Sequence, residues 1–188
     1  MCKELNEMTL KELWRLFPVR LVPYDENWKR QYCEIERVIK TALGTFNGAV
    51  INHIGSTAMP GIYAKDIIDV LVELPEIADI RSAALVLENC GFIRMSESAE
   101  RISLNKGYAK HGFEDKVYHV HLRFKGDNGE LYFRDYLNDN PAIAGEYERL
   151  KLSLKEKYEF DRDAYTDSKA DFINRYTKIA KEMYKGRY

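Results

Sequence analysis

Residues 53–61 form a short segment whose residue types could bind phosphate. The segment reads His-Ile-Gly-Ser-Thr-Ala-Met-Pro-Gly, with Gly55, Ser56 and Thr57 near its centre. A glycine lets the backbone approach a ligand closely, and backbone N–H groups with two hydroxyls can donate hydrogen bonds to phosphate oxygens. The same residue types after a strand also make ordinary turns. The segment therefore predicts either a phosphate cradle or a plain turn.

A carboxylate, Asp69, follows this segment inside a stretch that alternates like a β-strand. Over residues 67–74, period-two alternation places Asp69, Leu71 and Glu73 on one face, opposite four apolar side chains. Asp69 need not enter the core, and a carboxylate that faces a Gly-Ser loop can hold Mg²⁺ against the phosphates of a nucleotide. Lys65 can offset the charge of those phosphates. The alternative is a loop-capping or salt-bridged aspartate.

A second stretch of alternating residues, 116–124, carries two imidazoles and a guanidinium on one face. His119, His121 and Arg123 share this face, and the opposite face is apolar and aromatic. Histidines two residues apart on a strand can ligate a metal or serve acid–base chemistry, or they can be hydrogen-bonded sheet residues. Arg123 suits an anionic ligand or is a solvated charge. We expect both histidines to face the same pocket as Asp69.

Several strands and helices must position these groups. Strand patterns cover residues 49–54, 67–74 and 116–124, and residues 92–115 hold one or two more. A turn at 126–129 ends the last of these strands. Apolar residues at helical spacing predict helices over residues 9–17, 25–44, 77–91, 131–137, 141–154 and 172–183. The pattern indicates an α+β fold, a mixed sheet flanked by helices with a helical C-terminal third.

Composition narrows the class of protein. The 188 residues suffice for one core, and 45% hydrophobic with 31% charged residues is typical of a globular chain. A formal net charge of −1 with dispersed charges favours neither nucleic acid nor an anionic membrane. No stretch approaches the ~18 apolar residues of a membrane span, and the N-terminal residues lack a signal-peptide pattern. We expect a cytoplasmic protein with reduced thiols at Cys2, Cys33 and Cys90.

The chain resembles the GrpB (UPF0157) family through several motifs in the same order. These motifs are Val22-Pro23-Tyr24-Asp25 with Trp28, residues 53–61, Lys65 through Asp69, His119-Val120-His121-Leu122, Phe133-Arg134-Asp135-Tyr136-Leu137, Tyr147 with Leu150-Lys151, and Tyr165 with Lys169 and Phe172-Ile173. Several spaced motifs are a far more specific signal than one glycine pattern. The resemblance runs from about residue 20 to near the end. We therefore expect an accessory N-terminal helix in residues 1–19 and one domain over residues 20–188.

The resemblance implies a nucleotidyltransferase-like fold. In that fold Gly55-Ser56 matches the Gly-Ser loop and Asp69 matches the first catalytic carboxylate. Active members of the wider superfamily carry a second carboxylate two residues later, a position that is Leu71 in this chain. Glu73 lies on the same face, but roughly 6–7 Å from Asp69 by strand rise, which is a poor spacing for one ion. Asp66 points to the opposite face. The departure puts a two-metal site in doubt.

The expected function is the binding of a nucleotide or another phosphorylated small molecule, with transfer of a nucleotidyl group and Mg²⁺ at Asp69 as its catalytic form. Gly55, Ser56 and Thr57 would cradle phosphates, Lys65 and Arg123 would offset their charge, and His119 or His121 would act as base or ligand. One alternative is a non-catalytic ligand-binding or regulatory module, which Leu71 favours. Another is a metal hydrolase built on His53, His119 and His121, which requires these side chains to converge.

Overall fold

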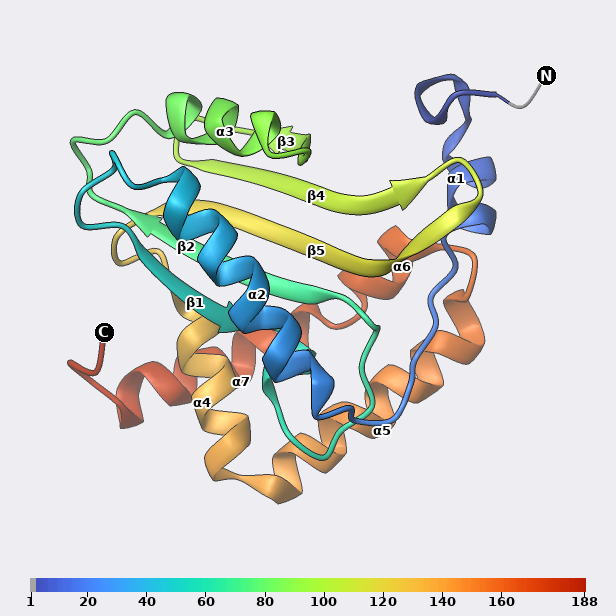
Figure 1. Ribbon diagram of the computed structural model, residues 1–188. Helices are drawn as coiled ribbons and strands as arrows, with labels where there is room; N and C mark the ends of the chain where they lie inside the picture. Colours follow the sequence, from blue (N-terminus) through green and yellow to red (C-terminus); the bar gives the residue numbers. More distant parts are fainter. Residues whose placement is uncertain (1–2) are drawn as a thin grey trace.

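A five-stranded β-sheet forms the centre of the structure, a computed structural model that describes residues 3–188 (Figure 1). The strands are β1 (Val50–Ile54), β2 (Ile68–Leu74), β3 (Ile93–Glu97), β4 (Arg101–Ala109) and β5 (Gly112–Phe124). Their order across the sheet is β1-β2-β5-β4-β3. β2 and β5 are parallel, and the other neighbours are antiparallel. The mixed sheet confirms the predicted α+β class.

The register between β2 and β5 aligns the residues that the sequence singled out. Asp69 is paired with His119, Leu71 with His121 and Glu73 with Arg123. Paired residues on neighbouring strands project from the same face of a sheet. The two alternating patterns of the sequence therefore meet on one face, although they lie about fifty residues apart.

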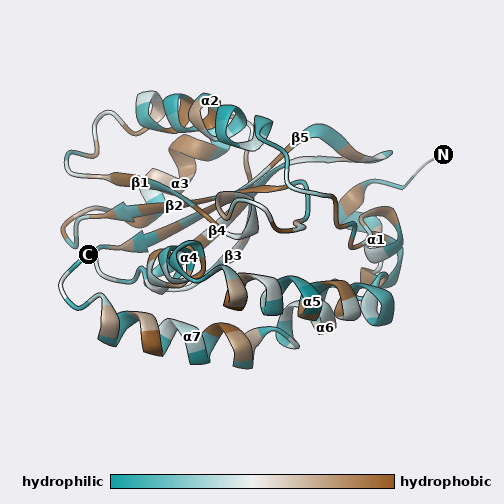
Figure 2. Cartoon of the chain, turned by 90° about the horizontal axis from the view of Figure 1, so that it is seen from below, coloured by the Kyte–Doolittle hydropathy of each residue, from teal (hydrophilic) through white to brown (hydrophobic). Residues whose placement is uncertain are grey.

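One face of the sheet is covered by α2 (Asn27–Ala42) and α3 (Ile80–Asn89), as Figure 2 shows. The amphipathic stripe predicted for α2 is confirmed, since Ile35 and Ile39 are buried in the main core with the even-numbered residues of β2. Trp28 donates from its indole nitrogen to Asp66 at 2.7 Å, so Asp66 holds α2 and does not face the site. This side of the sheet is structural.

The opposite face is covered by the helical C-terminal third, α4 (Gly129–Asp139), α5 (Pro141–Tyr158), α6 (Arg162–Asp167) and α7 (Ala170–Met183) (Figure 2). Both faces of β2 are thus enclosed. Leu71 is fully buried against Ile54 and Leu131. Glu73 is buried as well, and its Oε1 accepts hydrogen bonds from Asn128 Nδ2 at 3.0 Å and from the Gly126 amide at 3.1 Å.

The structure resolves or corrects three sequence predictions. Residues 92–115 contain β3, β4 and the start of β5. The alternation of this stretch is hard to recognise in the sequence because the register shifts between Lys106 and Tyr108. α3 begins at Ile80, capped by Asp79, so the prediction that Ile77 belongs to its apolar stripe is wrong; Ile77 is 97% exposed. The short helix α6 was not predicted as a separate element.

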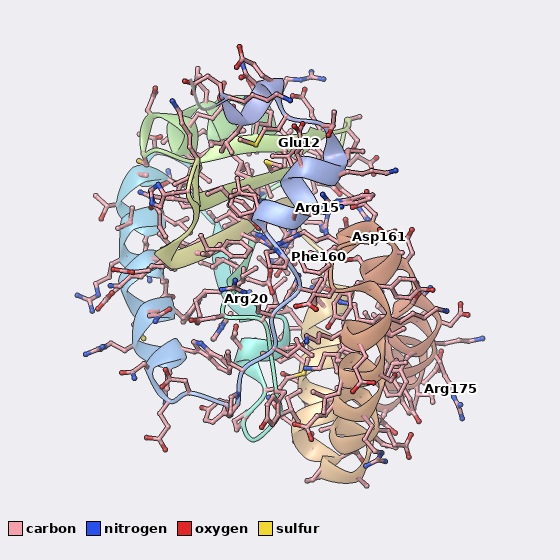
Figure 3. All side chains as sticks on the ribbon, turned by 90° about the vertical axis from the view of Figure 1, so that its right-hand side faces the viewer. Glu12, Arg15, Arg20, Phe160, Asp161 and Arg175 are labelled. Atoms are coloured by element: carbon pink, nitrogen blue, oxygen red, sulfur yellow. The ribbon has the colours of Figure 1, made fainter. Side chains whose placement is uncertain are left out.

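The N-terminal segment packs beside the turn between α5 and α6. It contains a 3-10 turn (Leu5–Glu7) and α1 (Leu10–Leu16), which the predicted capping box of Thr9 and Glu12 begins. After α1 the Val19 amide donates to the Glu159 carbonyl at 2.8 Å. Figure 3 views this side, with Glu12 and Arg15 of α1 above Phe160 and Asp161. The N-terminal helix is therefore anchored to the C-terminal helices.

The expectations about membrane spans and cysteines can be compared with the structure. Within residues 3–188 no helix is both long enough and apolar enough to span a membrane. Cys33 and Cys90 are free and half-buried, and Cys2 lies outside the described residues.

Candidate functional site

A cavity of about 720 Å³ lies between the sheet and the C-terminal helices. Its floor is the sheet face that carries Asp69, His119 and His121. Its walls come from the loop after β1 and from α5, α6 and α7. The cavity therefore opens over the three titratable side chains that the sequence singled out.

The carboxylate and the two imidazoles converge as expected. Asp69 Oδ1 lies 3.1 Å from His119 Nδ1 and 3.9 Å from His121 Nε2. One ligand atom from each residue falls within 4.8 Å of the others, which is a spacing that a single metal ion can bridge. The three side chains therefore face one pocket, as the alternation predicted.

The hydrogen bonds of His119 define its tautomer. Burial lowers the pKa of His119, so the ring is neutral near pH 7 and carries one N–H. Nδ1 must hold that proton, because its partner is the Asp69 carboxylate. Nε2 then accepts from the Tyr108 hydroxyl at 2.7 Å, and the Tyr108 oxygen accepts from Arg162 Nη2 at 3.0 Å. Both ring nitrogens of His119 are therefore engaged.

His121 is less constrained. Its Nε2 points toward Asp69, and its Nδ1 lies 3.4 Å from the Ser103 hydroxyl. Asp69 and His121 are thus the groups that a divalent cation can reach without breaking the His119 hydrogen bonds. A lone carboxylate fits a Mg²⁺ ion that also binds ligand phosphates and water, while an added imidazole suits Mn²⁺ or Zn²⁺ as well.

The protonation of Asp69 follows from the same contacts. Burial by itself would raise the pKa of Asp69, but the hydrogen bond from His119 and the nearby ring of His121 lower it well below its usual range. Asp69 therefore remains an anion throughout the physiological range. An ionised carboxylate is the state that cation binding requires.

Four lysine and arginine side chains that line the cavity are buried or half-buried, and we call them the cationic wall. They are Lys65, Lys151, Arg162 and Lys169, and within the described part of the chain none of them forms a salt bridge. Burial lowers the pKa of Lys65 and of Lys151 to about 7 and the pKa of Lys169 to about 8. Lys151 donates to the Tyr63 carbonyl. With pKa values of about 7 to 8, these lysines can take up protons near neutral pH, so the cluster suits an anion that favours their charged form.

The sequence prediction of the site did not include the cavity residues of the C-terminal helices. Tyr147 and Lys151, and again Tyr165 and Lys169, follow a Tyr-x-x-x-Lys spacing. The first pair lies on one face of α5. The second pair joins Tyr165 of α6 to Lys169, the residue before α7. In each pair the ammonium lies over the tyrosine ring, at 4.9 Å and 4.4 Å from the ring centroid. The repeated spacing was a sequence signal for this wall. Arg162 had no such signal.

The Gly55–Thr57 segment reaches the cavity, and all three residues line it. Gly55 has φ +71°, and a Cβ at this position would lie 2.3 Å from Asp69 Oδ2. The glycine therefore accommodates the Asp69 carboxylate. The Thr57 hydroxyl donates to the Ile67 carbonyl at 3.2 Å and lies 3.0 Å from His53 Nε2, so it is directed into the fold. Ser56 lines the cavity.

Two predicted residues lie apart from the cavity. Arg123 does not line it, because the guanidinium is held by Glu130 at 2.9 Å and by Asp127 at 3.6 Å. His53 lies on the opposite face of the sheet, where its ring stacks on that of Tyr32 with the centroids 4.6 Å apart. His53 does not converge with His119 and His121, so the three-histidine metal centre required for the hydrolase alternative is absent from the described residues.

Comparison with known proteins identifies relatives that match most of the chain. The model of a protein family described as GrpB protein matches residues 18–179. The chain is 35% identical over 172 residues to Glutamate-rich protein GrpB of Alkalihalophilus pseudofirmus, covering 88% of this chain and 95% of that protein. It is also 28% identical over 173 residues to a dephospho-CoA kinase of Mycolicibacterium paratuberculosis, of which it covers 42%. The match covers 79% of this chain.

Solved structures agree with this relationship. The crystal structure of conserved protein GrpB from Enterococcus faecalis superposes with a TM-score of 0.74 at 31% identity, covering 88% of this chain and 99% of that chain. The Cid1 poly(U) polymerase bound to MgATP gives a TM-score of 0.52 at 12% identity, covering 79% of this chain and 46% of that chain. At that identity the second likeness concerns the fold alone, and it is the fold of a nucleotidyltransferase.

Proposed function

The chain belongs to the GrpB family, and from this premise we propose that it binds a nucleotide or another phosphorylated small molecule in the cavity above Asp69. The observation that carries the proposal is the cationic wall, in which Lys65, Lys151, Arg162 and Lys169 are buried or half-buried without salt-bridge partners among the described residues. Such a concentration of buried charge is costly unless an anion compensates it. A ligand with several phosphate charges supplies that compensation.

The size and chemistry of the cavity support the same class of ligand. Its volume of about 720 Å³ is within the usual ~300–1,000 Å³ of small-molecule sites. Ser56 offers a hydroxyl to a phosphate oxygen, and Gly55 and Thr57 line the same space. The related fold of the Cid1 polymerase holds MgATP in its crystal structure. These features extend the expected phosphate cradle from one loop to the C-terminal helices.

We predict that phosphate-bearing compounds stabilise the protein. Inorganic pyrophosphate and ATP should raise its unfolding temperature, because a ligand at ~100 times its dissociation constant adds about 2.7 kcal/mol to the free energy of unfolding. Differential scanning fluorimetry measures the shift, and calorimetry gives the stoichiometry. Adenosine is the control, since it lacks the charges that the lysines would pair. Equal shifts with adenosine and ATP, or no shift with any phosphate, contradict the proposal.

Nucleotidyl transfer with Mg²⁺ is a second candidate, favoured by the position of Asp69 in a nucleotidyltransferase-like fold. Asp69 with His121 would hold the ion, which would supply charge stabilisation to a phosphoryl group when bound. His119 would take up a proton at Nε2 once its hydrogen bond with Tyr108 opens. Leu71, buried where a second carboxylate would stand, favours the alternative of a non-catalytic binding module. Turnover of a nucleotide distinguishes the two.

We predict that Asp69→Asn strengthens the binding of ATP in the absence of metal and removes the increase in ATP affinity that a divalent metal produces. The substitution removes a negative charge that faces the cationic wall, so ATP without metal should bind more tightly. It also removes the carboxylate, so the gain in ATP affinity produced by Mg²⁺ or Mn²⁺ should disappear. Calorimetry with and without metal measures both effects. Asp163→Asn, in the same cavity, is the matched control and should keep the gain.

The outcome that contradicts a ligand role for Asp69 is equally clear. If Asp69→Asn keeps the full metal-dependent gain, then another group binds the ion. If Asp69→Asn is much less stable, but its folded fraction binds ATP with the affinity of the native protein, Asp69 serves the fold.

A further inference from the structure

A second cavity, of about 960 Å³, lies beneath the N-terminal segment and is mostly apolar. We call it the N-terminal cavity; its apolar lining includes Leu5, Leu10, Leu13, Trp14, Ile93 and Met95. Leu10, Ile93 and Met95 remain 61%, 51% and 58% exposed. Large apolar side chains gathered around a concave surface are characteristic of a binding site.

The floor of the N-terminal cavity continues the sheet face of the candidate site. Asn105 on β4 is the register partner of His119, and Ile93 on β3 is the partner of Asn105. Register partners project from the same face. Asn105 and Ile93 therefore line the N-terminal cavity on the face where His119 lines the first cavity.

The two cavities adjoin and share part of their lining. Arg162 and Asp163 line both of them. The ring of Tyr108 lines the N-terminal cavity, and its hydroxyl is bonded to His119 on the other side. Arg162 is held at this junction, because it donates to Tyr108 and, through Nη1, to the Phe17 carbonyl at 3.0 Å. A ligand bound in one cavity therefore lies beside residues that also line the other cavity.

The roof of the N-terminal cavity lies outside the family match. That match begins at residue 18, whereas the roof is formed by residues 4–17. The cationic cavity lies within the matched residues. The family match therefore includes the cationic part of the site, and the N-terminal helix adds an apolar neighbour to it.

We propose that the N-terminal cavity binds the apolar part of an amphipathic ligand whose phosphate lies in the cationic cavity. The inference rests on the proposed function and names the ligand class: a phosphate ester with an alkyl or aryl group. Charge fixes the orientation. Lys110, which also lines the N-terminal cavity, is paired with Glu4. Arg162 lines both cavities and has no carboxylate partner among the described residues, so it is the cation that an anionic group would meet.

Alkyl phosphates of increasing length test the proposal. Methyl, butyl and octyl phosphate share one head group, and each buried CH₂ is worth about 0.8 kcal/mol, a factor of about four. Octyl phosphate has four more CH₂ groups than butyl phosphate and should therefore bind about 200-fold more tightly. Calorimetry below the micelle concentration measures the affinities. The fluorescence of Trp14 should shift to the blue with octyl phosphate, because Trp14 lines the cavity while Trp28, the second tryptophan, is already buried.

A matched pair of surface variants locates the apolar group. Leu10→Asp should remove most of the advantage of octyl over butyl phosphate and leave methyl phosphate unchanged. Leu85→Asp on α3 is the control, since Leu85 is 57% exposed, much like Leu10, and lines neither cavity. Both positions are exposed, so neither variant should unfold. Trp14→Phe should abolish the fluorescence shift.

Different failures have different meanings. If methyl phosphate and pyrophosphate bind but affinity does not rise with chain length, the N-terminal cavity is not part of the ligand site and the proposed function stands. If no phosphate binds at all, the proposed function fails and this inference fails with it. If Leu10→Asp dissociates a dimer in size-exclusion chromatography, a second copy covers the cavity and the ligand proposal is overturned.

Discussion

Gly55→Ala is expected to destabilise the protein and to abolish metal-dependent ligand binding. A Cβ at residue 55 would lie 2.3 Å from Asp69 Oδ2 and 2.9 Å from Asp69 Cβ and Cγ, so the carboxylate must move. Gly55 also has φ +71° and ψ −175°, a region essentially restricted to glycine, and an alanine there costs about 1–3 kcal/mol. Each kcal/mol lowers the unfolding temperature of a protein of this size by about 2–4 °C.

The control for Gly55→Ala is a glycine that also has a positive φ but lies in open space. Gly61 has φ +82°, and a Cβ added there would meet no described atom within 4 Å, so Gly61→Ala incurs the backbone strain alone. We expect Gly55→Ala to be less stable than Gly61→Ala and to lose the gain in ATP affinity produced by metal. Thermal unfolding and calorimetry measure the two effects. Equal stability of the variants, with metal-dependent binding intact, would show that Asp69 tolerates the extra methyl group.

Lys65→Met and Lys169→Met are expected to separate ligand binding from stability. Neither ammonium has a hydrogen-bond acceptor or salt-bridge partner among the described residues, and both lie over the Tyr165 ring. A charge-assisted hydrogen bond contributes about 1.5–3 kcal/mol, so each variant should weaken pyrophosphate binding about 10–100-fold. The free protein should be as stable or more stable, because an uncompensated buried charge is removed.

The same lysines predict opposite pH dependences for binding and for stability. Their pKa values in the folded protein, about 7 for Lys65 and about 8 for Lys169, lie below those in the unfolded chain. Between these values and about 10.4 the unfolded chain binds more protons, so their contribution to the free energy of unfolding rises with pH. Phosphate binding needs the protonated amines, so affinity should fall from pH 7 to pH 9.

Calorimetry in buffers of different ionisation enthalpy measures the proton uptake that accompanies pyrophosphate binding. Uptake near pH 8 should shrink in Lys65→Met and Lys169→Met. Lys40→Met is the control, since Lys40 is exposed on α2, across the sheet from the cavity. If the lysine variants lose stability and keep their affinity for pyrophosphate, the lysines are structural and the cationic wall does not bind phosphate.

The sequence alone determined the family, the α+β class and most of the elements around the sheet. Local patterns were sufficient for these, because capping residues, helical stripes and period-two alternation depend on neighbours in the chain. The capping box of Thr9 and Glu12 and the alternating strands of Asp69 and His119 are examples. Alternation even predicted that Asp69, His119 and His121 would share a face, which the parallel register confirmed.

Only the tertiary structure decided which groups face the ligand cavity. Arg123 alternates correctly with His121, yet Glu130 and Asp127 hold it, and these carboxylates follow a turn that no local pattern relates to β5. The cationic wall comes from helices about a hundred residues beyond Lys65, and Arg162 reaches the site through contacts with Phe17 and Tyr108. Periodicity gives the face of an element, whereas the partner of that face depends on long-range packing. The chemistry of this site lies where those distant faces meet.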